Sequence, residues 1–168
     1  VVDDYHGTLV ADPYRWLEDP ESGQTLAWVE AENKLTHEYL SGDHRDAIHE
    51  RLTQLWDYPR WSVPVKEGDR YFYSYNDGLM DQPLWYVQDD VDAEPRTLLD
   101  PNQLSEDGTS AVTSVEPSRD GRLLAYTISV GGSDWQELHI RDVDSGQDLD
   151  DVLHYLKFSS IAWHPDSQ

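Results

Sequence analysis

Apolar side chains between about residues 24 and 56 recur every three or four positions, the spacing of one face of an α-helix. This pattern predicts two helices, with Ser41-Gly42 ending the first and Asp43 capping the second. The apolar positions are Trp28, Ala31, Leu35 and Tyr39 in the first helix and Ile48, Leu52, Leu55 and Trp56 in the second.

A shorter element precedes them in the segment "DPYRWLED", where two aromatic residues and an arginine lie beside a leucine. We expect Asp12 to cap a short helix with Pro13 at its first position, ending before Asp19-Pro20. Short helices bury little of one another's surface. The apolar faces of all three are therefore expected to pack against something else.

After Tyr58-Pro59 the apolar period changes to two, which is typical of β-strands. Turn signals rich in Gly, Asp and Asn separate the runs, so this part is predicted to be all-β and built of hairpins. The expected strands are Tyr71 to Tyr75, Leu84 to Val87, Leu123 to Ile128 and Leu138 to Ile140.

The β part also repeats. "EGDRYFYSY" resembles "DGRLLAYT", and "LWYV" resembles "LHIR", each pair about 50 positions apart. A third copy is expected to begin at "HPDSQ", after a strand in "SSIAW". Repeats of this length with four short strands indicate the blades of a β-propeller, whereas a two-sheet sandwich is the alternative without repeats. Blades bury their faces against neighbouring blades, so two blades are expected to belong to a larger propeller.

Composition narrows the choice of partners. The 168 residues include 34 acidic and 12 basic side chains, for a formal net charge of −22. Such a field repels phosphate backbones and anionic lipids, so nucleic acids and membrane surfaces are poor partners. The acidity fits either a salt-rich cytoplasm or a bias in genomic base composition. There is no cysteine and no run long enough for a membrane span.

Several segments together resemble the N-terminal part of the prolyl oligopeptidase family. They are "DDYHGTLVADPYRWLEDPES", "AWVEAENKLT", "LWDYP", "RYFYSYNDGL", "LLDPNQLSEDGT" and the long stretch from "LLAYTISVGGSDW" to "LKFSSIAW". The resemblance implies a mixed fold. Residues 1–57 would be the helical segment that packs on an α/β-hydrolase catalytic domain absent from this chain. Residues 58–168 would be two blades, and the start of a third, of a seven-bladed β-propeller.

The resemblance also implies a chemistry. Family members cleave short peptides after proline with a Ser-Asp-His triad, whose serine lies on a G-x-S-x-G turn. This chain contains no such motif, and the family places all three residues in the later hydrolase segment. No catalytic residue is therefore assigned here, and we expect the chain alone to be inactive.

Two residues carry expected roles in the family. Phe158 in "LKFSSIAW" matches a propeller phenylalanine that lines the substrate pocket; the alternative is a phenylalanine in the core of a blade. Asp134 in "GGSDW" matches a loop near the domain interface, where the carboxylate can pair with a basic residue of the catalytic domain and bias opening. Alternatively, Asp134 only shapes a glycine-rich turn.

No cofactor or metal is expected. His37, His44 and His49 do not share one helical face, and "DVDSGQDLDD" lacks the spacing of a calcium loop and is better explained as a hairpin turn. The expected partners are short proline-containing peptides and the protein's own hydrolase domain, in an intact protein that is monomeric. The expected location is the cytoplasm, or the periplasm or exterior if a signal peptide precedes Val1.

Two other functions remain open at this point. The chain could be a truncated, non-catalytic propeller module that binds or supports another protein. It could also belong to a related oligopeptidase of different specificity. Unpaired blade edges and uncovered helix faces argue against the first, because such surfaces promote aggregation.

Overall fold

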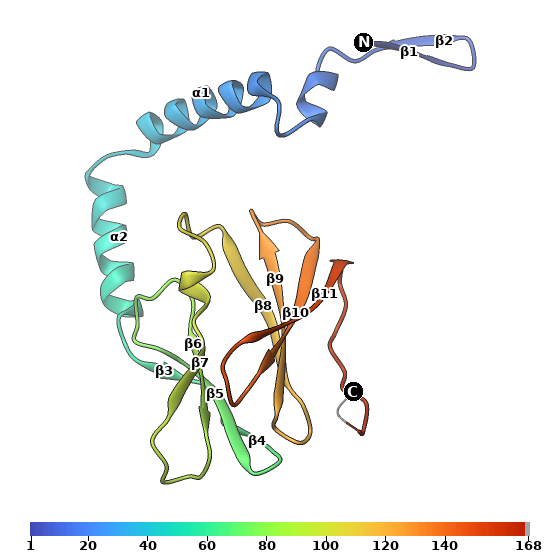
Figure 1. Cartoon of the computed structure of the whole chain (residues 1–168). Coiled ribbons are helices and arrows are strands. Elements are labelled where there is room, and N and C mark those ends of the chain that lie inside the picture. The colour runs from blue at the N-terminus through green and yellow to red at the C-terminus, as the bar shows by residue number, and fades with distance from the viewer. Residues whose placement is uncertain (167–168) are drawn as a thin grey trace. The chain divides into compact units, whose positions relative to one another are not determined.

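A computed structural model describes residues 1–166 (Figure 1). The chain divides into two compact units, Val1–Leu52 and a second unit that begins at Thr53. The first unit is mainly helical and the second consists of β-sheets. Among the described residues, no helix combines the length and the apolar content that crossing a membrane requires.

The first unit opens with a hairpin that the sequence patterns did not predict. Strands β1 (Val2–Tyr5) and β2 (Thr8–Ala11) pair in antiparallel fashion and are followed by a four-residue 3-10 helix, η1 (Arg15–Glu18). The predicted cap at Asp12 is wrong in detail, because the helix starts at Arg15 and has no side-chain cap. Instead, Asp12 accepts a hydrogen bond from the Tyr14 amide (3.0 Å).

Arg15 explains part of the unusual composition of "DPYRWLED". Its guanidinium pairs with Asp3 in β1, with Asp12 (2.8 Å) and with Glu18 (3.3 Å), so that it joins the hairpin to η1. The hydrogen bonds from Arg15 and from the Tyr14 amide lower the pKa of Asp12 below its ordinary value. Arg15 is therefore an internal tie of this unit.

Two longer helices follow, as predicted. Helix α1 (Gly23–Leu40) is capped by Ser22, whose Oγ accepts from the Thr25 amide (3.2 Å), and it ends at Ser41. Helix α2 (Asp43–Trp56) begins where the sequence indicated. The apolar positions named above, except Ala31, expose between 45 and 87% of their surface, although Trp16 packs edge to face on Trp28 and Arg60 lies over the Trp56 ring.

The second unit contains two antiparallel sheets. The first has the order β3-β5-β6-β7, with β4 also paired to β5; the second has the order β11-β10-β9-β8. The strands of the first sheet are β3 (Arg60–Trp61), β4 (Val65–Glu67), β5 (Arg70–Asn76), β6 (Leu84–Gln88) and β7 (Arg96–Leu99). Those of the second are β8 (Ser110–Pro117), β9 (Leu123–Val130), β10 (Gln136–Asp142) and β11 (Asp148–Leu156), with a short 3-10 helix η2 (Pro101–Gln103) between the sheets.

The predicted strands correspond to β5, β6, β9 and β10, and the repeat has a structural counterpart. Strands β5 and β9, which contain the first repeated motif, each lie second in a four-strand series; β6 and β10, with the second motif, each lie third. The "DVDSGQDLDD" segment turns between β10 and β11, as the hairpin interpretation required. Two sheets of this kind are the arrangement expected for consecutive blades.

The strand predicted in "SSIAW" is absent. Residues 157–164 have no strand pairing, and a turn follows at Pro165-Asp166; Ser167 and Gln168, the end of the proposed third repeat, lie outside the described residues. The segment is held instead by Trp163, whose indole donates to the Glu116 carbonyl (3.0 Å). A strand needs a neighbour for its backbone groups, and no described residue supplies one here.

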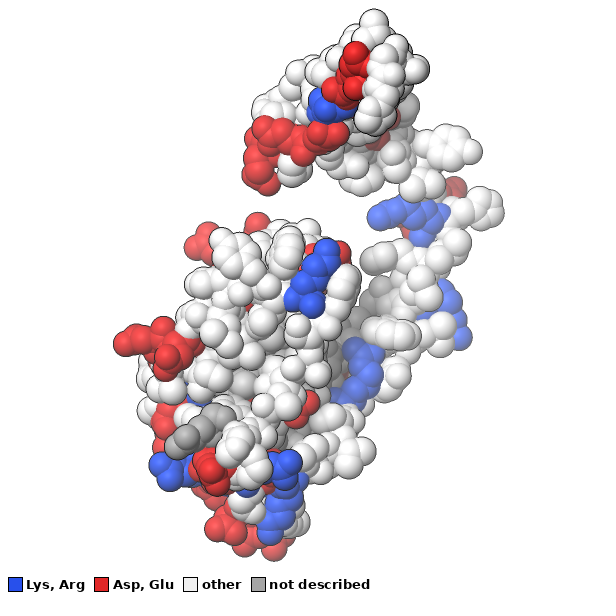
Figure 2. Space-filling model, turned by 90° about the vertical axis from the view of Figure 1, so that its right-hand side faces the viewer, with Lys and Arg blue, Asp and Glu red and all other residues white. Residues whose placement is uncertain are grey.

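Both sheets contribute to one apolar core. Its buried side chains are Phe72, Val87, Leu98 and Leu99 from the first sheet and Leu124, Tyr126 and Val143 from the second. The hairpin turns β4–β5, β6–β7, β8–β9 and β10–β11 lie at one end of this sheet pair, which we call the turn end (Figure 1). The opposite end, with the β5–β6 and β9–β10 loops, is the loop end. On the face drawn in Figure 2, acidic and basic side chains crowd toward the turn end.

Candidate functional site

The loop that carries Asp134 connects β9 to β10 at the loop end and is held by its own hydrogen bonds. Gly131 and Gly132 have φ of +60° and +73°, a backbone conformation that glycine adopts without strain. The Ser129 hydroxyl donates to the Ser133 carbonyl (2.6 Å), and the Ser133 hydroxyl accepts from the Trp135 amide (3.1 Å). These bonds fix the direction in which Asp134 and Trp135 leave the sheet.

Lys157 joins the two residues that the sequence singled out. Its ammonium pairs with Asp134 (3.1 Å) and lies over the rings of Trp135 and Phe158, 5.2 to 5.3 Å from their centroids. An ammonium over aromatic faces is attracted by their electron-rich surfaces. Asp134 and Phe158 therefore belong to one cluster, which we call the Lys157 cluster: Asp134, Trp135, Lys157 and Phe158.

Phe158 is 83% exposed, so it is not a core residue of the second sheet. Its φ is +51°, which is uncommon for a residue other than glycine. The expectation that it lines a substrate pocket, and that Asp134 acts as a latch, stays a prediction. In the described residues, the basic partner of Asp134 is Lys157 of the same sheet pair.

A hollow of about 350 Å³ opens beside this cluster. The Trp135 and Tyr155 rings meet edge to face across a centroid distance of 6.3 Å, and His154 Nδ1 lies 2.8 Å from a Glu137 oxygen. The wall combines aromatic and carboxylate groups and is completed by Ile128, Val130, Ser133 and Gln136. Such a surface can hold an apolar ring together with a hydrogen-bonding group.

Sequence reasoning missed the central position of Lys157 and the parts played by Trp135 and Tyr155. The available signal was a lone cation directly before Phe158 in an acidic protein, but its partner lies 23 positions earlier across a hairpin. No group of three or more His, Cys, Asp or Glu side chains within residues 1–166 is arranged to hold a metal ion. Ser133 and His154 both line the hollow, but the Ser133 hydroxyl accepts from the Trp135 amide and His154 Nδ1 contacts Glu137.

Comparison with known proteins assigns the family. A model of the "Prolyl oligopeptidase, N-terminal beta-propeller domain" matches residues 1–168. The chain belongs to the prolyl oligopeptidase family. It is 43% identical to a prolyl endopeptidase of Elizabethkingia meningoseptica over 96% of its length, and 34% identical to prolyl oligopeptidase A of Amanita bisporigera over 95%.

Solved structures of family members agree with the fold. One, from a study of inter-domain dynamics in two prolyl endopeptidases, aligns with 99% of this chain at a TM-score of 0.81 and 34% identity. Another, prolyl oligopeptidase B of Galerina marginata bound to a 35-residue substrate, aligns with 99% at a TM-score of 0.77 and 27% identity. The chain spans about a quarter of these relatives: 23% of the Elizabethkingia protein and 25% and 27% of the two solved chains.

Proposed function

We propose that this chain is the N-terminal part of a serine-type oligopeptidase that hydrolyses short peptides on the carboxyl side of proline. The observation that carries the proposal is the 43% identity, over nearly the whole chain, to a protein named prolyl endopeptidase. In this proposal the two sheets are the first blades of a seven-bladed propeller that limits access to the active site. The uncovered faces of α1 and α2 pack on an α/β-hydrolase domain.

The chemistry is assigned to residues outside this chain. The sequence has no G-x-S-x-G motif, so the nucleophile, its histidine base and the orienting aspartate belong to the hydrolase domain. The contribution of the present residues is to admit and hold the peptide. Phe158 and Trp135 offer exposed aromatic faces, which suit the flat, apolar ring of proline.

The test uses the intact protein from the reading frame that contains this chain, with two fluorogenic peptides that differ only in proline or alanine before the cleaved bond. We expect at least about tenfold higher kcat/KM for the proline peptide, the discrimination available to a shaped apolar pocket. The 168-residue chain alone should cleave neither peptide. Equal cleavage of both peptides would favour a relative of other specificity, and cleavage by the 168-residue chain would contradict the assignment of the triad.

The proposed roles of Phe158 and Asp134 have their own test in the intact enzyme. Phe158→Ala should raise KM for the proline peptide several-fold while leaving thermal stability nearly unchanged, because the ring is exposed in this chain. Asp134→Ala should change kcat/KM and reduce its dependence on salt. If Asp134→Ala leaves both the kinetics and the salt dependence unchanged, the latch role is wrong.

A further inference from the structure

We propose that the two sheets form a single rigid body whose seam is locked by polar side chains at both ends and does not open when the protein works. The seam is the interface between the β4–β7 sheet and the β8–β11 sheet. No backbone ladder crosses it, because each sheet pairs only within itself. Side chains must therefore supply the directional contacts that hold the sheets in register.

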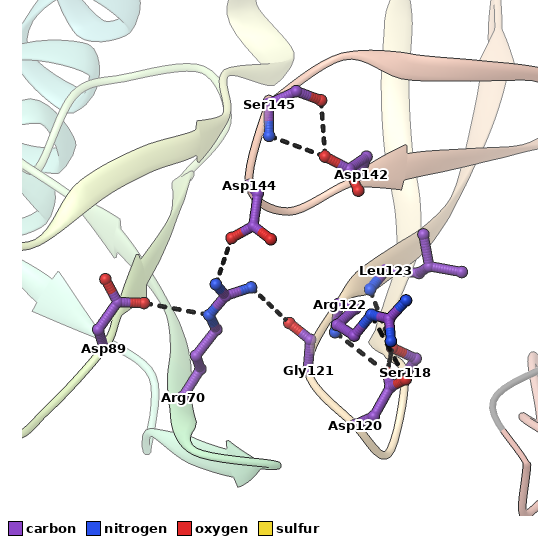
Figure 3. A network of polar contacts seen from close by, with 10 residues as sticks. All are labelled: Arg70, Asp89, Ser118, Asp120, Gly121, Arg122, Leu123, Asp142, Asp144 and Ser145. Atoms are coloured by element: carbon purple, nitrogen blue, oxygen red, sulfur yellow. Dashed lines mark hydrogen bonds and ion pairs between the residues drawn. The ribbon is translucent and has the colours of Figure 1, made fainter.

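At the turn end, Arg70 reaches from the first sheet into the second (Figure 3). Its Nε donates to Asp89 of the first sheet (3.0 Å), while its terminal nitrogens donate to the Gly121 carbonyl (3.0 Å) and pair with Asp144 of the second. The Arg70 side chain is 21% exposed, but Asp89 and Asp144 are 67% and 66% exposed, so each ion pair alone contributes little. The hydrogen bond to the Gly121 carbonyl is partly buried and is the stronger contact across the seam.

Two glycines let the turns approach closely beneath this arginine. Gly68 and Gly121 have φ of +59° and +70°, and a Cβ added to Gly121 would lie 2.6 Å from the Glu67 carbonyl oxygen. A Cβ added to Gly68 would collide with the Asp120 carbonyl. The backbones of the β4–β5 and β8–β9 turns are therefore in direct contact here. Neither glycine can be replaced by a residue with a Cβ without moving the sheets apart.

At the loop end, Gln82 links the two sheets by hydrogen bonds. Its Nε2 donates to the Ser110 carbonyl (2.8 Å) and its Oε1 accepts from the Val112 amide (2.8 Å). Ser110 and Val112 are two positions apart on β8, which is an edge strand. The amide of Gln82 thus satisfies a donor and an acceptor that a neighbouring strand would otherwise pair.

Beside the β10–β11 turn, Arg141 of β10 also links the two sheets. It donates to the Leu98 carbonyl of the first sheet (2.8 Å) and is held by two contacts of 2.8 Å to Asp148 of its own sheet. Its guanidinium also lies 5.5 Å from the centroid of the buried Tyr126 ring. Opening the seam would therefore break the five polar contacts that three side chains make across it, and would expose the shared apolar core.

Hydrogen exchange of the intact protein tests this coupling. The Val112 amide reports the loop end, and the Val143 amide, buried in the core and bonded to the Arg122 carbonyl, reports the turn end. Arg70→Met should raise the hydrogen-exchange rate of the Val112 amide about tenfold, although Val112 lies at the opposite end of the seam. The reason is that two sheets forming one rigid body open together. Gln82→Ala should in turn raise exchange at Val143.

The matched control is Arg122→Met. Arg122 lies in the β8–β9 turn, but its side chain is 75% exposed and its ion pair with Asp120 is long (4.0 Å), so exchange should stay unchanged at both reporters. If Arg70→Met speeds exchange only at residues 118–123 and leaves Val112 unchanged, the rigid-body proposal is overturned. Asp144→Ala, which removes the ion pair of Arg70 with the second sheet, provides the same comparison if Arg70→Met does not fold.

If the seam stays closed, substrate peptides do not reach the active site by passing between these two sheets. This consequence rests on the proposed function. Turnover of a saturating proline peptide should leave exchange at Val112 and Val143 unchanged. Faster exchange during turnover would overturn this consequence. Absence of proline cleavage would refute the proposed function alone, because exchange of the unliganded protein still reports the locked seam.

Discussion

The two units of the chain place their apolar side chains in different surroundings. In the sheet pair, Leu124 and Tyr126 are almost fully buried by residues of the same chain. In residues 1–52, Thr25 alone is buried, while Trp28, Leu35 and Ile48 remain largely exposed. The sheet pair can therefore draw stability from its own core, whereas the helices gain little from burial within residues 1–52. The lesson is that regular secondary structure and a self-sufficient core are separate properties.

The largest expected effect concerns the core of the sheet pair. Leu124→Ala should reduce the free energy of unfolding by about 3 kcal/mol, because it leaves a cavity where no solvent enters. Urea unfolding of the 168-residue chain measures this loss. Val130→Ala on the same strand is the control, since Val130 is exposed and should change the free energy by less than about 1 kcal/mol. Equal losses would mean that this core does not hold the unit together.

A second substitution examines the helices. Leu35→Asp should change the stability of the 168-residue chain by less than about 0.5 kcal/mol, because the side chain already faces solvent. In the intact protein the same change should cost about 2 kcal/mol or more, since it would bury a charge against the proposed hydrolase domain. Thermal unfolding of both forms provides the comparison. The same small effect in both forms would show that the face of α1 stays uncovered.

Acid should weaken the turn end of the sheet pair. Hydrogen bonds from the Ser145 hydroxyl and amide lower the pKa of Asp142. Burial opposes the ionisation of Asp148, but the hydrogen bond and charge of Arg141 outweigh it, so the pKa of Asp148 is also lowered. A lowered pKa in the folded state adds stability above the unfolded value of about 3.9, and this contribution is lost as pH falls through the folded value.

The measurement is urea unfolding between about pH 7 and pH 2, in a range set by the ordinary aspartate pKa. Wild-type stability should decline below about pH 4, and Asp142→Asn should be less stable at neutral pH but show a shallower decline. Parallel pH curves for the two proteins would rule out a stabilising role for this carboxylate.

The last substitution, at the Lys157 cluster, is expected to have only a small effect on stability. Lys157→Met keeps the length of the side chain but removes its charge, and should cost less than about 1 kcal/mol because the Asp134 pair is exposed. The variant should nevertheless raise KM for the proline peptide in the intact enzyme, because Trp135 and Phe158 lose their common support. Lys157→Arg should restore most of the affinity.

Lys66→Met is the matched control, since Lys66 lies 5.5 Å from the centroid of the Tyr71 ring in β4–β5, away from the loop end. It should have no effect on KM. A similar rise in KM for both variants would point to a general effect of charge and not to the Lys157 cluster.

The sequence predicted the elements that depend on interactions between residues close together along the chain, and it missed those that depend on distant ones. Helices α1 and α2 and strands β5, β6, β9 and β10 carry regular apolar spacing, so local patterns sufficed. Strands β8 and β11 are the edges of their sheet, and the acidic "DLDD" start of β11 follows from its exposure. Such strands have no clean alternation to detect, and charged residues at an edge protect it from unwanted pairing.

The site was predictable only in part. Asp134 and Phe158 were named from a resemblance, but their connection through Lys157 depends on the β9–β10 loop meeting the end of β11. The contacts of Arg15 could not be predicted either. No local sequence pattern indicates that one guanidinium will bind both a hairpin and a 3-10 helix. Contacts of this kind become visible only after the chain has folded.

Gln82 and Arg70 have a consequence for building hybrid propellers. Because side chains, and not a shared strand, join the sheets, a recombined protein could exchange the β8–β11 module without cutting a ladder. The incoming module would need a glycine at position 121 and an acidic residue at position 144 to bind Arg70. Its first strand would also need a free backbone edge to hydrogen-bond with Gln82. Chimeras that keep these pairs matched should assemble, and mismatched ones should reach the soluble fraction in lower yield.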